Sequence, residues 1–190
     1  AFFLFSCSSG TLGAGDYLKN KYPKSKVAVG EALQSPTILS NGFGSHRIEG
    51  IGDTHIPWIH NIKNMDNAAA VDDKRVVSLM RLFNEPLGRE YLIEQGIPED
   101  FVNKLELLGI SSIANIIGAI KMAKYYELDE HQLVMTVFTD SMELYSSRLE
   151  SMKAESGDYT REDAVRDYYQ YLRGIDTANT LEMDLEQRKR

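Results

Sequence analysis

Five small residues, Cys7, Ser8, Ser9, Gly10 and Thr11, follow a short apolar run and precede a helical pattern. Small residues let backbone N–H groups approach an anion closely, and a helix N-terminus adds unpaired donors and a favourable dipole. The hydroxyl groups supply further donors. The segment therefore predicts a phosphate-binding loop, although a plain strand-to-helix turn would have the same composition. No Gly-Lys-Ser/Thr sequence follows, so it is not a Walker loop.

Two other features carry residue types that can bind or react. Ser111 and Ser112 open a strongly apolar helix after Gly109, and competition between two serines for the N-cap position explains this pattern without a ligand. A thiol such as Cys7 at a helix N-terminus ionises more readily than usual. No histidine lies near Cys7 in the sequence to act as its base, so the pattern does not favour a cysteine nucleophile.

A glycine-punctuated segment over residues 46–57 contains several ionisable side chains. Asp53, His55 and His60 suggest a metal site by residue type, but their spacing matches no standard zinc motif. Loop histidines held in hydrogen bonds explain the pattern equally, and we expect no metal.

The order of elements is typical of an α/β fold. Apolar residues at 2–6, a helix over 12–22 and a strand over 26–30 form a strand–helix–strand unit, which implies parallel pairing. The apolar run 133–138 predicts a parallel core strand. It ends in Thr139-Asp140-Ser141, at the polar edge where such folds place ligands.

Helices are expected between these strands. A short strand over 68–71 precedes Asp72 and Asp73, which are suited to cap a helix. Residues 87–108 read as helical in pieces, with a break at Gly96 and Pro98.

The chain changes character after Tyr145, where charged residues become frequent. Thr160 and Asp163 have the spacing of a capping box. The helical face that follows is Val165, Tyr168, Tyr169 and Leu172. We therefore expect a three-layer αβα domain with a parallel sheet over 1–145 and a helical extension over 146–190.

Composition excludes several classes of protein. With 43% hydrophobic and 26% charged residues among 190, the chain is globular, and its net charge of -7 argues against a nucleic-acid partner. One cysteine rules out an internal disulfide and indicates a reducing, cytoplasmic location. No stretch is apolar enough to cross a membrane. The chain has no initiator Met and begins in an apparent core strand, so we expect it to be cut from a longer protein.

Five segments together resemble a known family. Residues 7–11 stand where the family has a Gly-Thr-Gly-Gly-Thr phosphate loop, and residues 26–31 stand where it has the following strand. Residues 46–57 are similar to its His-Lys-Ile-Gln-Gly-Ile-Gly…Ile-Pro segment. Residues 109–112 are similar to its Gly-Ile-Ser-Ser-Gly turn, and residues 139–141 to its Pro-Asp-Ser edge. In this order they resemble the C-terminal portion of the fold-type-II, or tryptophan-synthase-beta-like, pyridoxal-phosphate-dependent enzymes. Cysteine synthase and cystathionine beta-synthase are members, and the chain looks most like a longer bacterial branch called the pyridoxal-phosphate-dependent beta subunit.

The resemblance implies a set of site residues. The loop 7–11 would bind the phosphate of pyridoxal 5'-phosphate, the hydroxyl of Ser111 would bond the pyridine nitrogen, and Gly50, Ile51 and Gly52 would line the active site. The family's Schiff-base lysine and substrate-carboxylate loop lie upstream of the phosphate loop, so we expect no catalytic residue on this chain. The chain departs from the family pattern at Cys7, Ser9 and Ile113, where the family has glycine.

The resemblance also implies an activity. A neutral hydroxyl at the ring nitrogen suits β-elimination and β-replacement on an amino acid, and the family is usually dimeric. We therefore expect a homodimer of the whole protein, with the N-terminal remainder of the same protein completing the site. Two other hypotheses stay open: a non-catalytic fragment or subunit that keeps the fold, and a Rossmann-type oxidoreductase domain in which Glu31 contacts the ribose of a nicotinamide dinucleotide.

Overall fold

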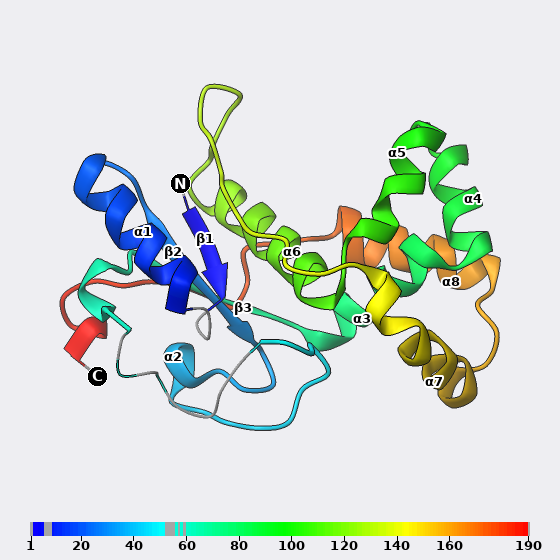
Figure 1. The fold of residues 1–190 in the computed structure, drawn as a ribbon, viewed down its shortest axis with the longest axis horizontal. Helices are drawn as coiled ribbons and strands as arrows, with labels where there is room; N and C mark the ends of the chain where they lie inside the picture. The colour runs from blue at the N-terminus through cyan, green and yellow to red at the C-terminus, as the bar shows by residue number, and fades with distance from the viewer. Residues whose placement is uncertain (1, 6–8, 52–55, 57, 59, 190) are drawn as a thin grey trace.

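The sheet at the centre of the molecule has four strands in the order β1–β2–β3–β4 (Figure 1). The computed structural model describes residues 2–5, 9–51, 56, 58 and 60–189. The strands are β1 (Phe2–Phe5), β2 (Val27–Ala32), β3 (Asn67–Val71) and β4 (Thr180–Glu182). The first three pair in parallel and β4 pairs antiparallel to β3. The predicted parallel strand–helix–strand unit is therefore confirmed.

Each face of the sheet is covered by a different hydrophobic core. Successive residues of a strand point to opposite faces, so Ala68 packs with Leu12 of α1 (Ser9–Lys21), whereas Ala69 packs on the other face. The second and larger core includes α3 (Asp73–Asn84) and α6 (Ile110–Tyr125). Helices on both faces make three layers, and the α/β class with αβα layering is confirmed.

The helices between β3 and residue 125 begin and end close to the predicted capping and helix-breaking residues. The side chain of Asp72 accepts a hydrogen bond from the backbone N–H of Lys74 at 3.0 Å and so caps α3. Gly96, with φ +87°, and Pro98 separate the next two helices. Those helices are α4 (Pro86–Glu94) and α5 (Glu99–Asn103), and a 3₁₀ turn (Lys104–Leu107) leads on to α6.

The predicted core strand over 133–138 is wrong. The segment runs outside the four-stranded sheet and forms only an isolated bridge at Met135. Leu133, Met135 and Phe138 are exposed, with 69%, 45% and 52% of their surfaces accessible. An apolar run reports hydrophobicity but not whether a neighbouring strand lies beside it, and among the described residues none pairs here to extend the sheet.

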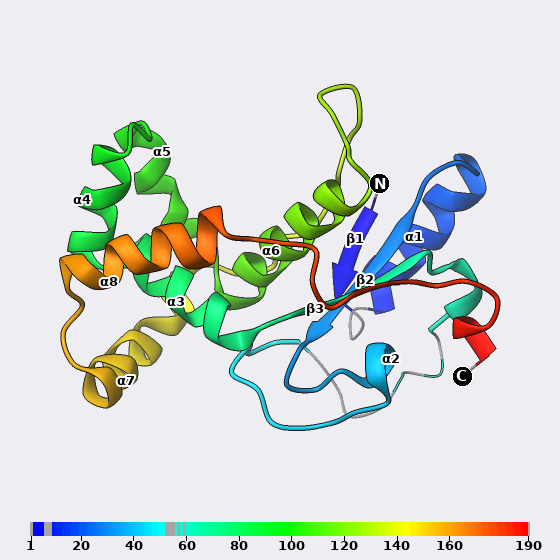
Figure 2. The same cartoon turned by 180° about the vertical axis from the view of Figure 1, so that it is seen from behind.

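The tail is helical only in its first part (Figure 2). Thr160 and Asp163 form the predicted capping box at the start of α8. After the helices the chain returns to the sheet as β4, a strand that was not predicted because it has only three residues. The tail elements before β4 are α7 (Ser146–Ser156), α8 (Arg161–Arg166) and a π-helical segment (Asp167–Arg173).

The π-helical segment changes which tail residues are buried. Tyr171 is buried, and Tyr168 packs edge-on against Tyr91 with ring centroids 5.6 Å apart. Tyr169 is 56% exposed, so the predicted single tyrosine face is split between core and surface. The domain division at residue 145 stays a prediction.

Among the described residues, no single helix has both the length and the hydropathy needed to cross a membrane. One pair of helical segments, Glu99–Leu107 and Ile110–Tyr125, meets the length and composition criteria together, and the two are bent by 116° at their junction.

Candidate functional site

Two of the predicted segments lie at helix starts on one edge of the sheet. β1 and β2 end on the side where α1 and α6 begin, and α2 (Thr37–Ser40) lies on the same side (Figure 1). Ligands of α/β proteins bind outside the carboxyl ends of parallel strands. The edge therefore has the expected location for a ligand site.

Ser111 lies in the first turn of α6 and is 4% exposed. Its hydroxyl oxygen is 3.0 Å from the hydroxyl oxygen of Thr139 and donates to Oδ1 of Asp140 at 3.3 Å. These partners fix the direction of the Ser111 side chain. The structure thus joins two segments, 109–112 and 139–141, that lie far apart in the sequence.

Asp140 is the centre of this polar cluster, a role that the sequence did not reveal. Its carboxylate accepts hydrogen bonds from Ser112, at 3.4 Å, and from the phenol of Tyr145. Its backbone carbonyl accepts the N–H of Gly109 at 3.0 Å. A Cβ at Gly109 would lie 2.2 Å from Oδ1 of Asp140, so this close approach requires glycine.

Tyr145 is held as a proton donor. Burial, followed by its hydrogen bond to Asp140, raises the pKa of the Tyr145 phenol to about 12. The phenol therefore stays protonated over the physiological range and can keep donating to the carboxylate. The spacing of five residues from Asp140 carried no signal for this pair.

Asn115 is a second residue that the sequence analysis missed. It is buried, one turn after Ser111, and its amide nitrogen donates to the backbone carbonyl of Val137 at 2.8 Å. Its side-chain oxygen is buried without a hydrogen-bond partner among the described residues. The available signal in the sequence was a single amide within the otherwise apolar run 113–120 of α6.

The start of α1 is more open. The helix begins at Ser9, three residues earlier than predicted, so Ser9, Gly10 and Thr11 lie in its first turn and not in a loop. Gly10 is exposed, and a Cβ at this position would meet no atom within 4 Å. Cys7 and Ser8 lie outside the described residues. The first N–H groups of a helix have no partner within it, so this turn can offer donors to an anion.

The loop that contains Gly50 and Ile51 is tied to two helices. Arg47 donates from its backbone N–H and from its guanidinium to Asp73 at the start of α3, both at 2.9 Å. Glu49 forms an ion pair with Arg148 of α7. Gly50 has φ +82°, which favours glycine, and Ile51 is buried. Gly52 lies outside the described residues.

The Arg47–Asp73 pair also affects the pKa of the Asp73 carboxyl. Partial burial acts to raise the pKa of the carboxyl, but the hydrogen bonds and charge of Arg47 outweigh it and hold that pKa below its usual value. The carboxylate therefore stays ionised and keeps the loop attached to α3.

Glu31 does not point out to a ligand. Its two carboxylate oxygens accept the N–H groups of Ile38, at 2.9 Å, and Leu39, at 2.8 Å. The side chain is 3% exposed, and burial raises the pKa of its carboxyl. Glu31 therefore anchors the start of α2 and has no free oxygen for a ribose, which disfavours the dinucleotide hypothesis.

The residues of the suggested metal site are only partly described. Within the described part of the chain, no group of three His, Cys, Asp or Glu residues is placed to hold a metal ion. His60 is buried, and burial lowers the pKa of its imidazole. Asp53 and His55 lie outside the described residues.

Comparisons with known proteins find relatives by sequence and by structure. No protein-family model matches the chain. Over 141 residues, 74% of this chain, it is 31% identical to a cysteine synthase of Staphylococcus aureus and 29% identical to cysteine synthase B of Campylobacter jejuni. These alignments cover 39% and 40% of the two relatives, so the chain spans about two fifths of their length.

Solved structures agree with the sequence relatives. A hydrogen sulfide-producing enzyme from Fusobacterium nucleatum matches 96% of this chain and 47% of its own, with a TM-score of 0.57 and 25% identity. An O-acetylserine dependent cystathionine beta-synthase from Helicobacter pylori matches 77% and 42%, with a TM-score of 0.56 and 27% identity. With the arrangement of β1, α1 and α6 described above, these similarities support one family for the chain, the fold-type-II pyridoxal-phosphate-dependent enzymes.

Proposed function

We propose that this chain is part of an enzyme that uses pyridoxal 5'-phosphate to act on an amino acid by β-elimination or β-replacement. The observation that carries the proposal is the buried hydroxyl of Ser111, which Thr139 and Asp140 hold at the sheet edge where α1 also begins. The sequence relatives named cysteine synthase support the same class of reaction.

The residues at this edge fit the cofactor. Its phosphate needs several donors and open space, and the first turn of α1 offers both around Gly10. Its ring needs a polar partner in a buried setting, and Ser111 is such a partner. We assign the phosphate to Cys7, Ser8, Ser9, Gly10 and Thr11.

The chain's own residues would then orient the cofactor. Bound pyridoxal phosphate supplies an electron sink for the amino-acid substrate. Ser111 would turn its single hydroxyl proton from Asp140 to the ring nitrogen, and a neutral donor there suits β-elimination and β-replacement. Asp140 acts through Ser111 as a positioning residue, and Tyr145 holds Asp140 in place by donating to its carboxylate.

The rest of the site lies beyond this chain in our proposal. Gly50, Ile51 and Gly52 would line the active site, on a loop that Arg47 and Glu49 attach to α3 and α7. The lysine that binds the cofactor and the segment that binds the substrate carboxylate would come from the remainder of the protein. We also propose that the whole protein is a homodimer and is located in the cytoplasm.

The test uses the full-length protein. We would record its visible absorbance with pyridoxal phosphate, reduce the protein with borohydride and map the modified peptide. The expected result is a visible chromophore and one modified lysine outside residues 1–190. A matched sample that receives borohydride before the cofactor controls for adventitious labelling of surface lysines.

Two outcomes would overturn the assignment. A modified lysine within 1–190 would show that the site residues have been placed on the wrong segments. If the full-length protein shows no chromophore, the proposal that it uses pyridoxal phosphate is wrong, and the non-catalytic hypothesis remains.

A further inference from the structure

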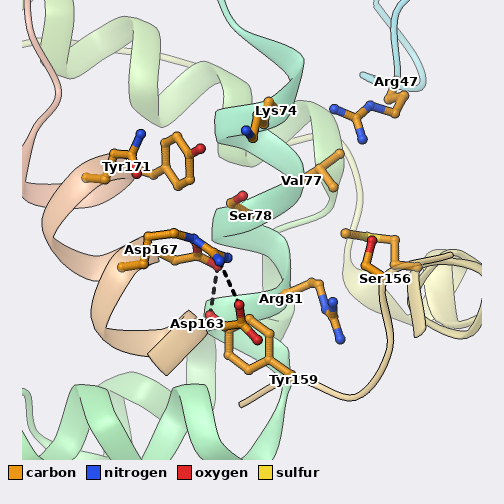
Figure 3. Close-up of a pocket in the computed structure, with 13 residues that line it drawn as sticks. Arg47, Lys74, Val77, Ser78, Arg81, Ser156, Tyr159, Asp163, Asp167 and Tyr171 are labelled. Carbon is orange, nitrogen blue, oxygen red and sulfur yellow. Dashed lines mark hydrogen bonds and ion pairs between the residues drawn. The ribbon is translucent and has the colours of Figure 1, made fainter. Parts of the chain in front are cut away.

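A cavity lies between α3 and the tail, and Ser111 is not among the residues that line it. It has a volume of about 380 Å³ and lies between α3, the end of α7 and the α8–π-helical segment (Figure 3). One wall is a row on α3, where Lys74, Ser78 and Arg81 follow at helical spacing. Ser156 and Tyr159 face this row from the tail (Figure 3).

The carboxylates in the wall are already paired. Arg166 forms ion pairs with Asp163 at 2.7 Å and with Asp167 at 2.9 Å. Tyr159 also donates its phenol proton to Asp167 at 2.9 Å. Both acids are therefore bonded within the wall, and the single charge of Arg166 offsets one of their two negative charges.

The most buried cation of the lining is held in a fixed orientation. Arg81 is 6% exposed, and its guanidinium stacks over the ring of Tyr159 at 4.9 Å from the ring centre. It donates to the backbone carbonyl of Gly157 at 3.0 Å, and Glu85 lies 3.3 Å from Nη2. The stacking and the carbonyl hold the planar donor in one orientation, which is how arginine recognises oxyanions.

Other donors around the cavity have no partner. Lys74 is an exposed cation without an ion pair among the described residues, and the hydroxyls of Ser78 and Ser156 likewise have no hydrogen-bond partner there. The lining of the cavity carries four cationic side chains against two carboxylates. With an ammonium, an ordered guanidinium and two hydroxyls around one cavity, it forms an environment for an anion with several acceptor oxygens.

We propose that this cavity binds a small molecule that carries a phosphate group, with Lys74, Ser78 and Arg81 as its contacts. Arg47, three residues before Gly50, also lines the cavity. Its guanidinium donates to Asp73. A bound phosphate would compete with Asp73 for Arg47. The cavity therefore connects ligand binding to the loop that the proposed function places at the active site.

The test is a titration of the full-length protein, saturated with pyridoxal phosphate, with inorganic phosphate at constant ionic strength. Isothermal calorimetry should show saturable binding in the wild type. Lys74→Gln removes one charge-assisted contact and should weaken the binding roughly tenfold or more. Lys74→Arg keeps the charge and should restore most of the affinity. Ser78→Ala should weaken binding by a smaller factor.

The control is Lys24→Gln, which removes an exposed lysine in the turn between α1 and β2 that has no ion pair in the described part of the chain. It should bind phosphate as the wild type does. Equal affinity in the Lys74→Gln and Lys24→Gln variants, or no saturable binding in the wild type, would overturn the proposal. If the protein does not take up the cofactor, the same titration without pyridoxal phosphate still compares these two lysines and gives an answer. A failure of the proposed function is therefore distinguishable from a failure of this site.

Discussion

The helices α1 and α6 begin at the same edge of the sheet, but their first turns are built in different ways. In α6 both serines are buried and bonded, and Gly109 touches the carboxylate that they share. In α1, Gly10 is exposed with open space around it. A closed first turn can fix the direction of one hydroxyl, whereas an open one leaves space for an anion with many oxygens. The two turns thus suit different ends of the same cofactor.

The largest effect is expected at the closed turn. In Gly109→Ala the new methyl group would overlap Asp140, whose side chain cannot move away without releasing Ser111, Ser112 and Tyr145. Overpacking of this kind typically costs about 1–3 kcal/mol. Urea denaturation should therefore show a clear loss in the free energy of unfolding.

The matched control is Gly13→Ala, in the interior of α1, where a Cβ would meet no atom within 4 Å. Replacing a helical glycine by alanine in open space typically stabilises by roughly 0.5–1 kcal/mol. Equal unfolding curves for the two variants would show that the α6 start is not closed by Asp140.

Asp140→Asn tests the centre of the cluster at constant size. The new amide group would face the phenol of Tyr145 or the hydroxyl of Ser111 in place of an acceptor, so one hydrogen bond is lost. We expect a loss of about 1–2 kcal/mol in the free energy of unfolding. A double-mutant cycle with Tyr145→Phe should show strong non-additivity, because both changes break the same bond. Additive effects would show that Tyr145 and Asp140 do not stabilise the protein through a shared hydrogen bond.

Tyr145→Phe makes a prediction about pH. The phenol has a pKa of about 12 in the folded protein against an ordinary value of 10.0. Between these values the unfolded state loses its proton while the folded state keeps it, so the free energy of unfolding falls as pH rises. The contribution is present in full below pH 10 and is absent in Tyr145→Phe.

The measurement for this prediction is urea denaturation at several values between pH 9 and pH 12. The wild type should lose its advantage over Tyr145→Phe across that window. Tyr17→Phe removes an exposed phenol of α1 and serves as the control. A difference between the wild type and Tyr145→Phe that stays constant with pH would contradict the buried donor.

Local patterns explain what could be predicted from the sequence. The strand–helix–strand unit, the Asp72 cap and the capping box at Thr160 are each written within a few neighbouring residues. The start of α6 at Gly109-Ile110 was found for the same reason. The start of α1 was placed too late because serine, glycine and threonine are as frequent in loops as in first helical turns.

Long-range pairing explains what could not be predicted. Ser111 and Asp140 are 29 residues apart, and nothing in either segment indicates that one contacts the other. The short strand β4 exists only because β3 offers it an edge. The segment 133–138 has the hydropathy of a core strand but runs outside the sheet, because strand formation depends on neighbours and not on the segment alone.

The smallest effect on stability is expected at the open turn, in Gly10→Ala. Its new methyl group would meet no atom within 4 Å, and alanine favours the helix, so stability should rise by roughly 0.5–1 kcal/mol. The same methyl group would occupy space that we assign to the cofactor phosphate, and pyridoxal phosphate should bind roughly tenfold more weakly, about 1.4 kcal/mol.

The control, Gly13→Ala, lies one turn further along α1 and should give the gain in stability without the loss of cofactor affinity. Thermal unfolding and a visible titration with pyridoxal phosphate on both variants separate the two effects. If both variants bind the cofactor equally well, the open space at α1 does not hold the phosphate, and the contrast between the two helix starts is one of stability alone.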